Sequence, residues 1–379
     1  MIYALFAIGF LTAYCYLLYP AVIWLWAALF PRPVSRGNCT PSVTVIIPAH
    51  NEQAYIEHKV RSVLDSDYPR ERLDVIVVSD GSTDRTVEIA QGFAGDRLRV
   101  IALPNRAGKP LAMNCGLAEA GGDAIVFTDA SGLLHRDAVR VLMSNFADED
   151  VGCVSGVIRH PGRSGVDRSM GLYRRHENFL RLCESRIHSS VGATGALFAV
   201  RRELVRPLEP DTILDDLAIP LEVIRRGRRA VIEPGAVCLE QEATGGSREF
   251  MRKVRTLAGN YQAFSRAPAA LLPFAGPVWL MVLSHKILRL LSPFLLVAFG
   301  LLSAVWAAGG GTVAIALVLT QAAGYGLAAC GAVLQKTALC HLYTFIVLQA
   351  AAAAAPFKFF LRRTSVLWPC GSVEVKGNA

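Results

Sequence analysis

Residues 43–128 alternate between short apolar runs and helical patterns, and this alternation constrains the fold more than any other feature of the chain. The apolar runs are rich in β-branched residues and cover 43–48, 73–79, 98–103 and 124–128. Segments with helical periodicity separate them at 53–65, 83–93 and 111–120. Because strands that alternate with helices pair in parallel and are covered on both faces, we predict a parallel, doubly wound α/β sheet.

The segment from 151 to 265 continues the α/β pattern less regularly. It predicts a long helix over 168–190, a Gly- and Ala-rich turn that leads into a strand over 192–200, a helix over 215–227, a strand over 229–239 and a basic helix over 248–264. The dinucleotide fingerprint GxGxxG is absent, and Gly108-Lys109-Pro110 lacks the Ser or Thr that follows the Lys of a Walker A motif.

Polar, turn-forming residues follow three of the predicted strands. Pro-Ala-His-Asn-Glu stands at 48–52, Ser-Asp-Gly-Ser-Thr-Asp at 79–84 and Thr-Asp-Ala-Ser at 128–131. Ligands of open α/β sheets bind beyond the carboxyl ends of the strands, so these segments are predicted to converge on a nucleotide. Gathered carboxylates repel one another unless a cation is present, and their oxygen atoms suit Mg²⁺ or Mn²⁺. The alternative is that Asp80 and Asp129 only cap turns and helices.

Five sequence blocks, in order over residues 40–265, resemble those of membrane-bound family 2 glycosyltransferases with a GT-A (Rossmann-like) fold, such as the cellulose, hyaluronan and poly-N-acetylglucosamine synthases. The blocks are the three strand ends above, Arg106-Ala-Gly-Lys109, and Ile213-Leu-Asp-Asp216. The resemblance implies a metal, Mg²⁺ or Mn²⁺, on Asp129 and Ser131. It also implies that the donor nucleotide sugar is bound by Pro48, His50, Glu52, Asp80, Lys109, Asp129, Arg252 and Arg255.

The fifth block is expected to supply the catalytic base. Inversion needs a carboxylate that takes the proton of the acceptor hydroxyl as it attacks the anomeric carbon. The resemblance assigns that role to Asp216, with Asp215 beside it to tune the base or orient the acceptor. Gly192, Thr194 and Gly195 resemble the acceptor-site loop of the family. The alternative is that the two aspartates only cap a helix, where acids are favoured in any case.

Two positions depart from the family pattern. Ser131 stands where the third acid of the DxD metal motif is expected, so the metal loses a charged ligand. The chain has Arg252-Lys-Val-Arg255-Thr256 where the family has QxxRW, so the basic residues are kept and the Trp is missing. In polymerising synthases that Trp belongs to the acceptor end, and its absence weakens the prediction of a processive polymerase.

Apolar segments flank the predicted α/β domain. Residues 2–30 carry no charge and are long enough to cross a bilayer, and no basic residue precedes them, so we predict a retained helix rather than a signal peptide. Further spans are predicted at 290–308 and 312–334, while 269–283, broken by Pro273 and Pro277, is expected to lie in the membrane interface. Whether 339–357 crosses is left open, because a full crossing places the basic tail after it outside, against the positive-inside rule.

The predicted organisation is therefore an α/β glycosyltransferase domain flanked by transmembrane helices. The parts are an N-terminal transmembrane helix over 1–31, a GT-A domain over 40–265, an interfacial segment with C-terminal transmembrane helices over 266–360, and a tail over 361–379. Arg32 and Arg36 follow the first helix and place the GT-A domain in the cytoplasm, at the cell inner (plasma) membrane.

Composition excludes some partners. The nine cysteines show no zinc spacing, so we expect free thiols, and the formal charge of +8 suits an anionic membrane leaflet. No nucleic-acid-binding signature occurs.

These features predict an inverting glycosyltransferase that moves a sugar from a UDP-sugar to a lipid or growing polysaccharide. The channel of a synthase usually takes more helices than are predicted here, so a single-sugar glycolipid transferase, or a synthase with partner subunits or as an oligomer, is an alternative. A catalytically inactive nucleotide-sugar sensor is another. A transporter is disfavoured because 290–334 holds no charged residue.

Overall fold

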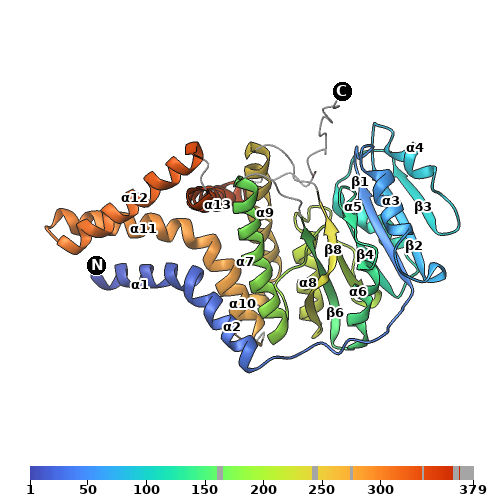
Figure 1. Ribbon diagram of the computed structural model, residues 1–379, viewed down its shortest axis with the longest axis horizontal. Helices are drawn as coiled ribbons and strands as arrows, with labels where there is room; N and C mark the ends of the chain where they lie inside the picture. The colour runs from blue at the N-terminus through green and yellow to red at the C-terminus, as the bar shows by residue number, and fades with distance from the viewer. Residues whose placement is uncertain (160–164, 241–245, 274–275, 335–336, 362–366, 368–379) are drawn as a thin grey trace. The chain divides into compact units, whose positions relative to one another are not determined.

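The computed structural model describes residues 1–159, 165–240, 246–273, 276–334, 337–361 and 367 (Figure 1). The chain divides into two compact units. Among the described residues, the sheet unit comprises 32–159 and 184–240, and the helical unit comprises 1–31, 165–183 and 246–361 without the gaps named above.

Within the described part of the sheet unit, eight strands form one sheet in the order β3-β2-β1-β4-β7-β6-β8-β5. The first four strands along the chain are β1 Val43–Ala49, β2 Leu73–Asp80, β3 Leu98–Leu103 and β4 Ala124–Phe127. They pair in parallel, which confirms the prediction. The other strands are β5 Leu133–Leu134, β6 Val151–Arg159, β7 Phe198–Arg201 and β8 Arg229–Leu239. Because β7 is antiparallel to both β4 and β6, the complete sheet is mixed.

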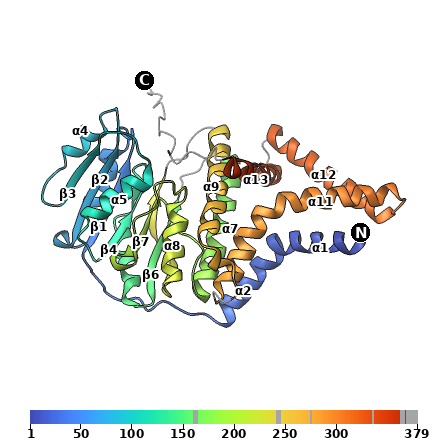
Figure 2. The ribbon, with the colours of Figure 1, turned by 180° about the vertical axis from the view of Figure 1, so that it is seen from behind.

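The sheet is covered on both faces by helices (Figures 1 and 2). One face packs against α3 Ile56–Leu64, α4 Thr86–Gln91 and α6 Ala138–Ser144, and the other against α5 Lys109–Glu119 and α8 Asp215–Arg225. Alternate residues of β1 divide between the two cores, since Val45 and Ile47 join the first and Ile46 joins the second. Strands buried on both faces explain why the apolar runs in the sequence are continuous rather than alternating.

The strand register aligns the ends of the parallel strands. Ala49 pairs with Ser79, and Ser79 pairs with Ala102. The segments that follow β1 and β2 therefore leave the sheet at the same edge. The polar segments after β1 and β2 are thus brought side by side, and their convergence on a nucleotide stays a prediction.

The helical unit contains the apolar segments. Its elements are α1 Ile2–Ala13, α2 Tyr19–Leu29, most of α7 Gly165–Ile187, α9 Gly246–Arg266, α10 Val278–Met281, α11 Leu288–Ala308, α12 Thr312–Leu334 and α13 Thr337–Phe360. Among the described residues, four helices are long and apolar enough to cross a membrane: Ile2–Leu29, Val278–Ala308, Thr312–Leu334 and Leu339–Phe360. The last is the segment whose crossing the sequence left open.

Two regions of the helical unit differ from the expected boundaries. The stretch 269–283 is divided, because Pro268–Leu271 forms a short 3₁₀ turn while 278–283 belongs to the continuous apolar helix that runs to Ala308. The segment 165–183 and α9 lie inside the predicted domain 40–265 but cluster with the apolar helices. The helix α9 clusters with the apolar helices because it packs along α13.

Each of the first two membrane-length helices contains a π-helical turn, Tyr14–Leu18 in one and Val282–Ile287 in the other. The first lies directly before Pro20, whose ring disfavours the regular hydrogen-bond ladder of the preceding turn. The two turns contact one another through Tyr14 and Ser284, whose hydroxyl oxygens lie 2.9 Å apart.

The charged residues near the start of the helix Val278–Ala308 are paired within the helical unit. Glu177 on α7 lies 2.9 Å from His285, 3.0 Å from Lys286 and 2.7 Å from Arg289. These three contacts tie α7 to that helix.

Candidate active site

Three charged residues that are far apart in the sequence meet at the carboxyl edge of the parallel strands. Lys109 is the first residue of α5, Asp129 follows β4, and Asp215 is the first residue of α8. The Nζ atom of Lys109 lies 2.8 Å from Oδ1 of Asp129 and 3.2 Å from Oδ2 of Asp215. One cation therefore joins the segment predicted to hold the metal to the segment predicted to hold the catalytic base.

The cation between these two carboxylates stays charged. Burial acts to lower the pKa of Lys109, but the carboxylates of Asp129 and Asp215 outweigh burial and hold this pKa above its ordinary value. The side chain of Asp129 keeps 35% of its surface exposed, whereas that of Asp215 keeps 10%. Asp129 is thus the carboxylate of the pair that a ligand reaches more easily.

Asp80 faces the protein backbone. Its side chain is fully buried, and its carboxylate accepts hydrogen bonds from the amides of Ala107 at 2.6 Å and Gly108 at 2.9 Å. The neighbouring Gly81 has φ +61°, and a Cβ there would lie 2.5 Å from the amide nitrogen of Arg106. Asp80 therefore shapes the loop that leads into Lys109, and its predicted contact with the nucleotide stays a prediction.

The segment after β1 is folded against the segment after β2. Nδ1 of His50 donates to the carbonyl oxygen of Asp80 at 2.6 Å, and the amide of Glu52 donates to Oγ1 of Thr86 at 2.8 Å. Asn51 has φ +55°, and its Oδ1 accepts a hydrogen bond from the amide of Thr83. These bonds hold the two strand ends together.

Glu52 is a buried carboxyl group in the site. Its Oε2 atom has no hydrogen-bond partner among the residues that the structure describes. Burial, with the nearby charges of Asp129 and Asp84, raises the pKa of Glu52 to about 7. Burial and the neighbouring negative charges together therefore favour the protonated form of Glu52.

The predicted acceptor loop lies against the predicted base. Gly192 has φ +98°, and the amide of Ala193 donates to the carbonyl oxygen of Asp216 at 2.6 Å. A Cβ at Gly195 would lie 3.2 Å from Oδ2 of Asp216. The amide of Thr194 donates to Oγ of Ser155 at 2.9 Å and holds the loop from the other side. A glycine at 195 therefore leaves room for the Asp216 carboxylate.

The residues at the DxD position fit a hard divalent cation only with help from the substrate. No group of three or more His, Cys, Asp and Glu residues suited to a metal occurs in the described parts of the chain. The Asp129 carboxylate and the Ser131 hydroxyl remain as oxygen donors. Mg²⁺ commonly takes one or two protein carboxylates and completes its shell with water and substrate phosphates, so this donor set fits.

Sequence reasoning missed Lys59, which supports the same segment. Lys59 is fully buried on the apolar face of α3, between Ile56 and Val63. Its Nζ atom donates to Oγ1 of Thr128 and to the carbonyl oxygen of Gly132, each at 2.6 Å. Burial lowers the pKa of Lys59 to about 8, although nearby acidic groups oppose that shift. The sequence signal that could have identified Lys59 is its position within a stripe of apolar residues on a predicted helix.

The predicted donor contacts Arg252 and Arg255 lie on α9, in the helical unit, so their contact with the donor stays a prediction. Pro48 lies within β1, next to the strand end.

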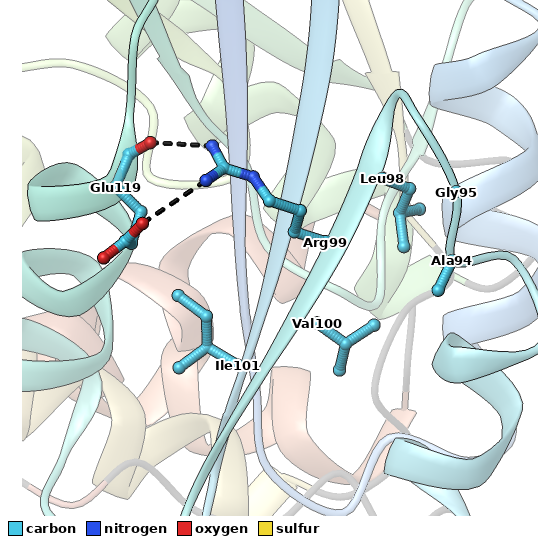
Figure 3. A pocket seen from close by; sticks show the side chains of 7 residues that line it. All are labelled: Ala94, Gly95, Leu98, Arg99, Val100, Ile101 and Glu119. Atoms are coloured by element: carbon cyan, nitrogen blue, oxygen red, sulfur yellow. Dashed lines mark hydrogen bonds and ion pairs between the residues drawn. The ribbon is translucent and has the colours of Figure 1, made fainter.

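A hollow of about 520 Å³ lies away from these residues, along the outer edge of β3 (Figure 3). It is lined by Ala94, Gly95, Leu98, Arg99, Val100, Ile101 and Glu119, and Arg99 is held across it by the side chain and carbonyl oxygen of Glu119. Its lining contains no residue of the strand ends, so the candidate site rests on the charged residues above.

Comparison with known proteins identifies the domain. Residues 44–208 match the family model described as Glycosyl transferase family 2. The probable glycosyltransferase YdaM of Bacillus subtilis (strain 168) is 30% identical over 237 residues, which are 58% of this chain and 55% of the relative. The poly-beta-1,6-N-acetyl-D-glucosamine synthase of Staphylococcus aureus (strain COL) is 27% identical over 251 residues, 63% of this chain and 59% of the relative. The chain thus spans little more than half the length of these two curated relatives.

A solved structure is similar over almost the whole chain. The mannosyltransferase PcManGT from Pyrobaculum calidifontis, in complex with GDP-Man and Mn²⁺, superposes with a TM-score of 0.75 and 28% sequence identity, covering 95% of this chain and 99% of that chain. Residues 44–208 therefore match a family 2 glycosyltransferase domain, and the chain shares the GT-A fold of such enzymes.

Proposed function

We propose that this enzyme transfers a sugar, with inversion, from a nucleotide-sugar donor to a lipid or growing glycan at the cytoplasmic face of the membrane. The observation that carries the proposal is the meeting of Lys109 with Asp129 and Asp215. It brings the donor-side turn and the predicted catalytic acids to one point. The Gly192–Gly195 turn lies beside those acids, as an acceptor loop requires.

Asp216 acts as the base in the proposed reaction. The acceptor oxygen attacks the anomeric carbon on the face opposite the nucleoside diphosphate, and the bond from that carbon to the diphosphate oxygen breaks. The Asp216 carboxylate takes the proton of the acceptor hydroxyl, so the sugar is inverted and the diphosphate leaves as an anion. The absence of a Cβ at Gly195, beside Oδ2 of Asp216, leaves room for that carboxylate.

Lys109 supplies positive charge to the leaving group. Its ammonium group is positioned by two carboxylates before any donor arrives, and preorganised charge of this kind stabilises a developing anion. Asp129 and Ser131 would hold Mg²⁺ or Mn²⁺, and such an ion, when bound, offsets charge on the diphosphate. The Mn²⁺ in the PcManGT complex supports this assignment.

The donor is proposed to be a UDP-hexose, in line with the resemblance to UDP-sugar-dependent synthases. A GDP-linked sugar is the second candidate, because the solved structure that is similar over 95% of this chain binds GDP-Man. Competition by UDP and GDP for donor binding would separate the two.

The acceptor is proposed to belong to a polysaccharide pathway, in line with the relative named as a poly-beta-1,6-N-acetyl-D-glucosamine synthase. Transfer of a single sugar to a lipid is the alternative, and Thr256, where polymerising synthases have Trp, favours it. Chain length of the product with lipid extract as acceptor would decide between them.

The test of the proposed function is the Asp216→Asn variant of the full chain in lipid nanodiscs. Release of UDP or GDP is measured over a panel of UDP- and GDP-sugars, with lipid extract and Mn²⁺. Loss of the base is expected to lower turnover about 10³-fold while nucleotide binding is kept. Glu222→Gln, on the same helix but paired with Arg225, is the matched control and should transfer normally. Full turnover by Asp216→Asn would show that another residue is the base.

We also propose that the sheet unit faces the cytoplasm, because Arg32 and Arg36 follow the first apolar helix directly. A single cysteine introduced in the sheet unit of a cysteine-free variant should resist an impermeant thiol reagent in intact cells. Labelling without membrane disruption would place this unit on the other side.

A further inference from the structure

Lys59 is a buried cation that the proposed mechanism does not use. Its side chain is fully buried, and its Nζ atom donates to Oγ1 of Thr128 and to the carbonyl oxygen of Gly132. These two acceptors stand on either side of residues 129–131, the segment that carries the proposed metal ligands. A single ammonium group thus forms hydrogen bonds with both ends of the turn.

The same bond network continues to the acceptor side. Oγ1 of Thr128 donates to the carbonyl oxygen of Ala196 at 2.6 Å, and Ala196 follows the loop that lies against Asp216. The path from Lys59 through Thr128 therefore links α3, the turn 128–132 and the end of the acceptor loop. A cation is suited to this position because charge-assisted hydrogen bonds are stronger than neutral ones.

The turn 128–132 is closely packed at Gly132. A Cβ at Gly132 would collide with Sγ of the buried Cys238 on β8, so the turn is pressed against the sheet there. If the ammonium group were absent, the Gly132 carbonyl oxygen would lose this partner in a buried site, which is unfavourable.

We propose that Lys59 is a positioning residue that holds the turn 128–132 in its metal-binding shape and thereby sets the affinity for Mg²⁺ or Mn²⁺. The inference rests on the proposed function, because it takes Asp129 and Ser131 as the metal ligands. Groups that orient metal ligands from behind typically change metal affinity 10- to 100-fold when they are removed.

The test compares Lys59→Met with Arg229→Met in the full chain. Arg229 is a matched control, since it is another fully buried cation of the sheet unit that donates to carbonyl oxygens, those of His188, Arg32 and Ser185. Binding of Mn²⁺ in the presence of UDP or GDP is followed by electron paramagnetic resonance of the free ion, and the melting midpoint is measured without metal.

Lys59→Met is expected to bind Mn²⁺ about tenfold more weakly, whereas Arg229→Met should melt earlier yet keep the affinity of the natural protein. Thr128→Val removes the hydroxyl that accepts from Lys59 and should weaken Mn²⁺ binding in the same direction. If Lys59→Met does not fold, the Mn²⁺ affinity of Thr128→Val is the measurement that tests the proposal.

Unchanged Mn²⁺ affinity in the folded variants, with only a lower melting midpoint, would show that Lys59 has a structural role alone. In that case metal-dependent transfer by the natural protein would leave the proposed function standing. If the natural protein bound no Mn²⁺ with either nucleotide, the metal assignment and this inference would both fall.

Discussion

Two glutamates, a buried one in the sheet unit and a partly buried one in the helical unit, have pKa values shifted in opposite directions. In the sheet unit, burial and the charges of Asp129 and Asp84 raise the pKa of Glu52 to about 7. In the helical unit, burial acts to raise the pKa of Glu177, but His285, Lys286 and Arg289 outweigh it and hold this pKa well below its ordinary value. The number of cations around each carboxyl group decides the direction.

The two clusters are suited to different roles. Three basic groups surround Glu177, so that cluster is complete by itself and ties two helices together. At the strand ends, Lys109 is shared between two acids, and Glu52 is influenced by the negative charges of Asp129 and Asp84. A site with surplus carboxylate is suited to receive a cation, whereas a site with surplus positive charge is not.

Lys109→Met, in the cluster of the sheet unit, is expected to have the largest effect, and that effect is on catalysis. Removing the shared cation leaves Asp129 and Asp215 without it and takes positive charge from the proposed leaving group. We expect kcat/KM for sugar transfer to fall about 10²- to 10³-fold, the range seen when one preorganised donor is removed. Measured transfer by the purified variant, with its melting midpoint as control for folding, checks this. Near-normal kcat/KM would make Lys109 structural.

Glu177→Gln is expected to act on stability instead. Loss of the carboxylate leaves Lys286 and Arg289 without their common partner, and breaking a largely buried ion pair from one side costs about 3 kcal/mol. The melting midpoint should fall while kcat/KM changes little at a temperature where the variant is folded. The double variant Glu177→Gln/Arg289→Met should recover part of the loss. A variant as stable as the natural protein would refute the idea that this cluster holds the helices together.

Glu52→Gln is expected to change stability no more than Glu177→Gln does, and its effect should depend on pH. The folded-state pKa of Glu52 is above its ordinary value of 4.5, so its contribution to stability is fully present below pH 4.5 and is lost as pH rises through about 7. The shift corresponds to a loss of about 3 kcal/mol above pH 7. Glu52→Gln does not ionise, and without metal it should melt later than the natural protein at pH 8 but not at pH 5. Parallel melting curves for the two proteins across this range would contradict the raised pKa.

Much of the fold could be predicted from local patterns. The strands over 98–103 and 229–239 and the helix over 312–334 appear with the predicted limits, because period and turn residues are properties of neighbouring positions. Parallel pairing of the first four strands followed from the alternation with helices. The antiparallel β7 in the middle of the sheet has no such local signal, since its partners depend on crossovers between distant segments.

The candidate site divides in the same way. Local sequence patterns predicted which acids stand at the strand ends and at the start of α8, because each is placed by the turn or helix that it begins. The contacts of Asp80 with the amides of Ala107 and Gly108, and of Lys109 with two acids, appear only in the folded protein. The same is true of the hydrogen bonds from Lys59 to both ends of the turn 128–132. These contacts join residues that the folded sheet brings together, and in a buried site a charged group must bond to whatever polar atoms the fold places within its reach.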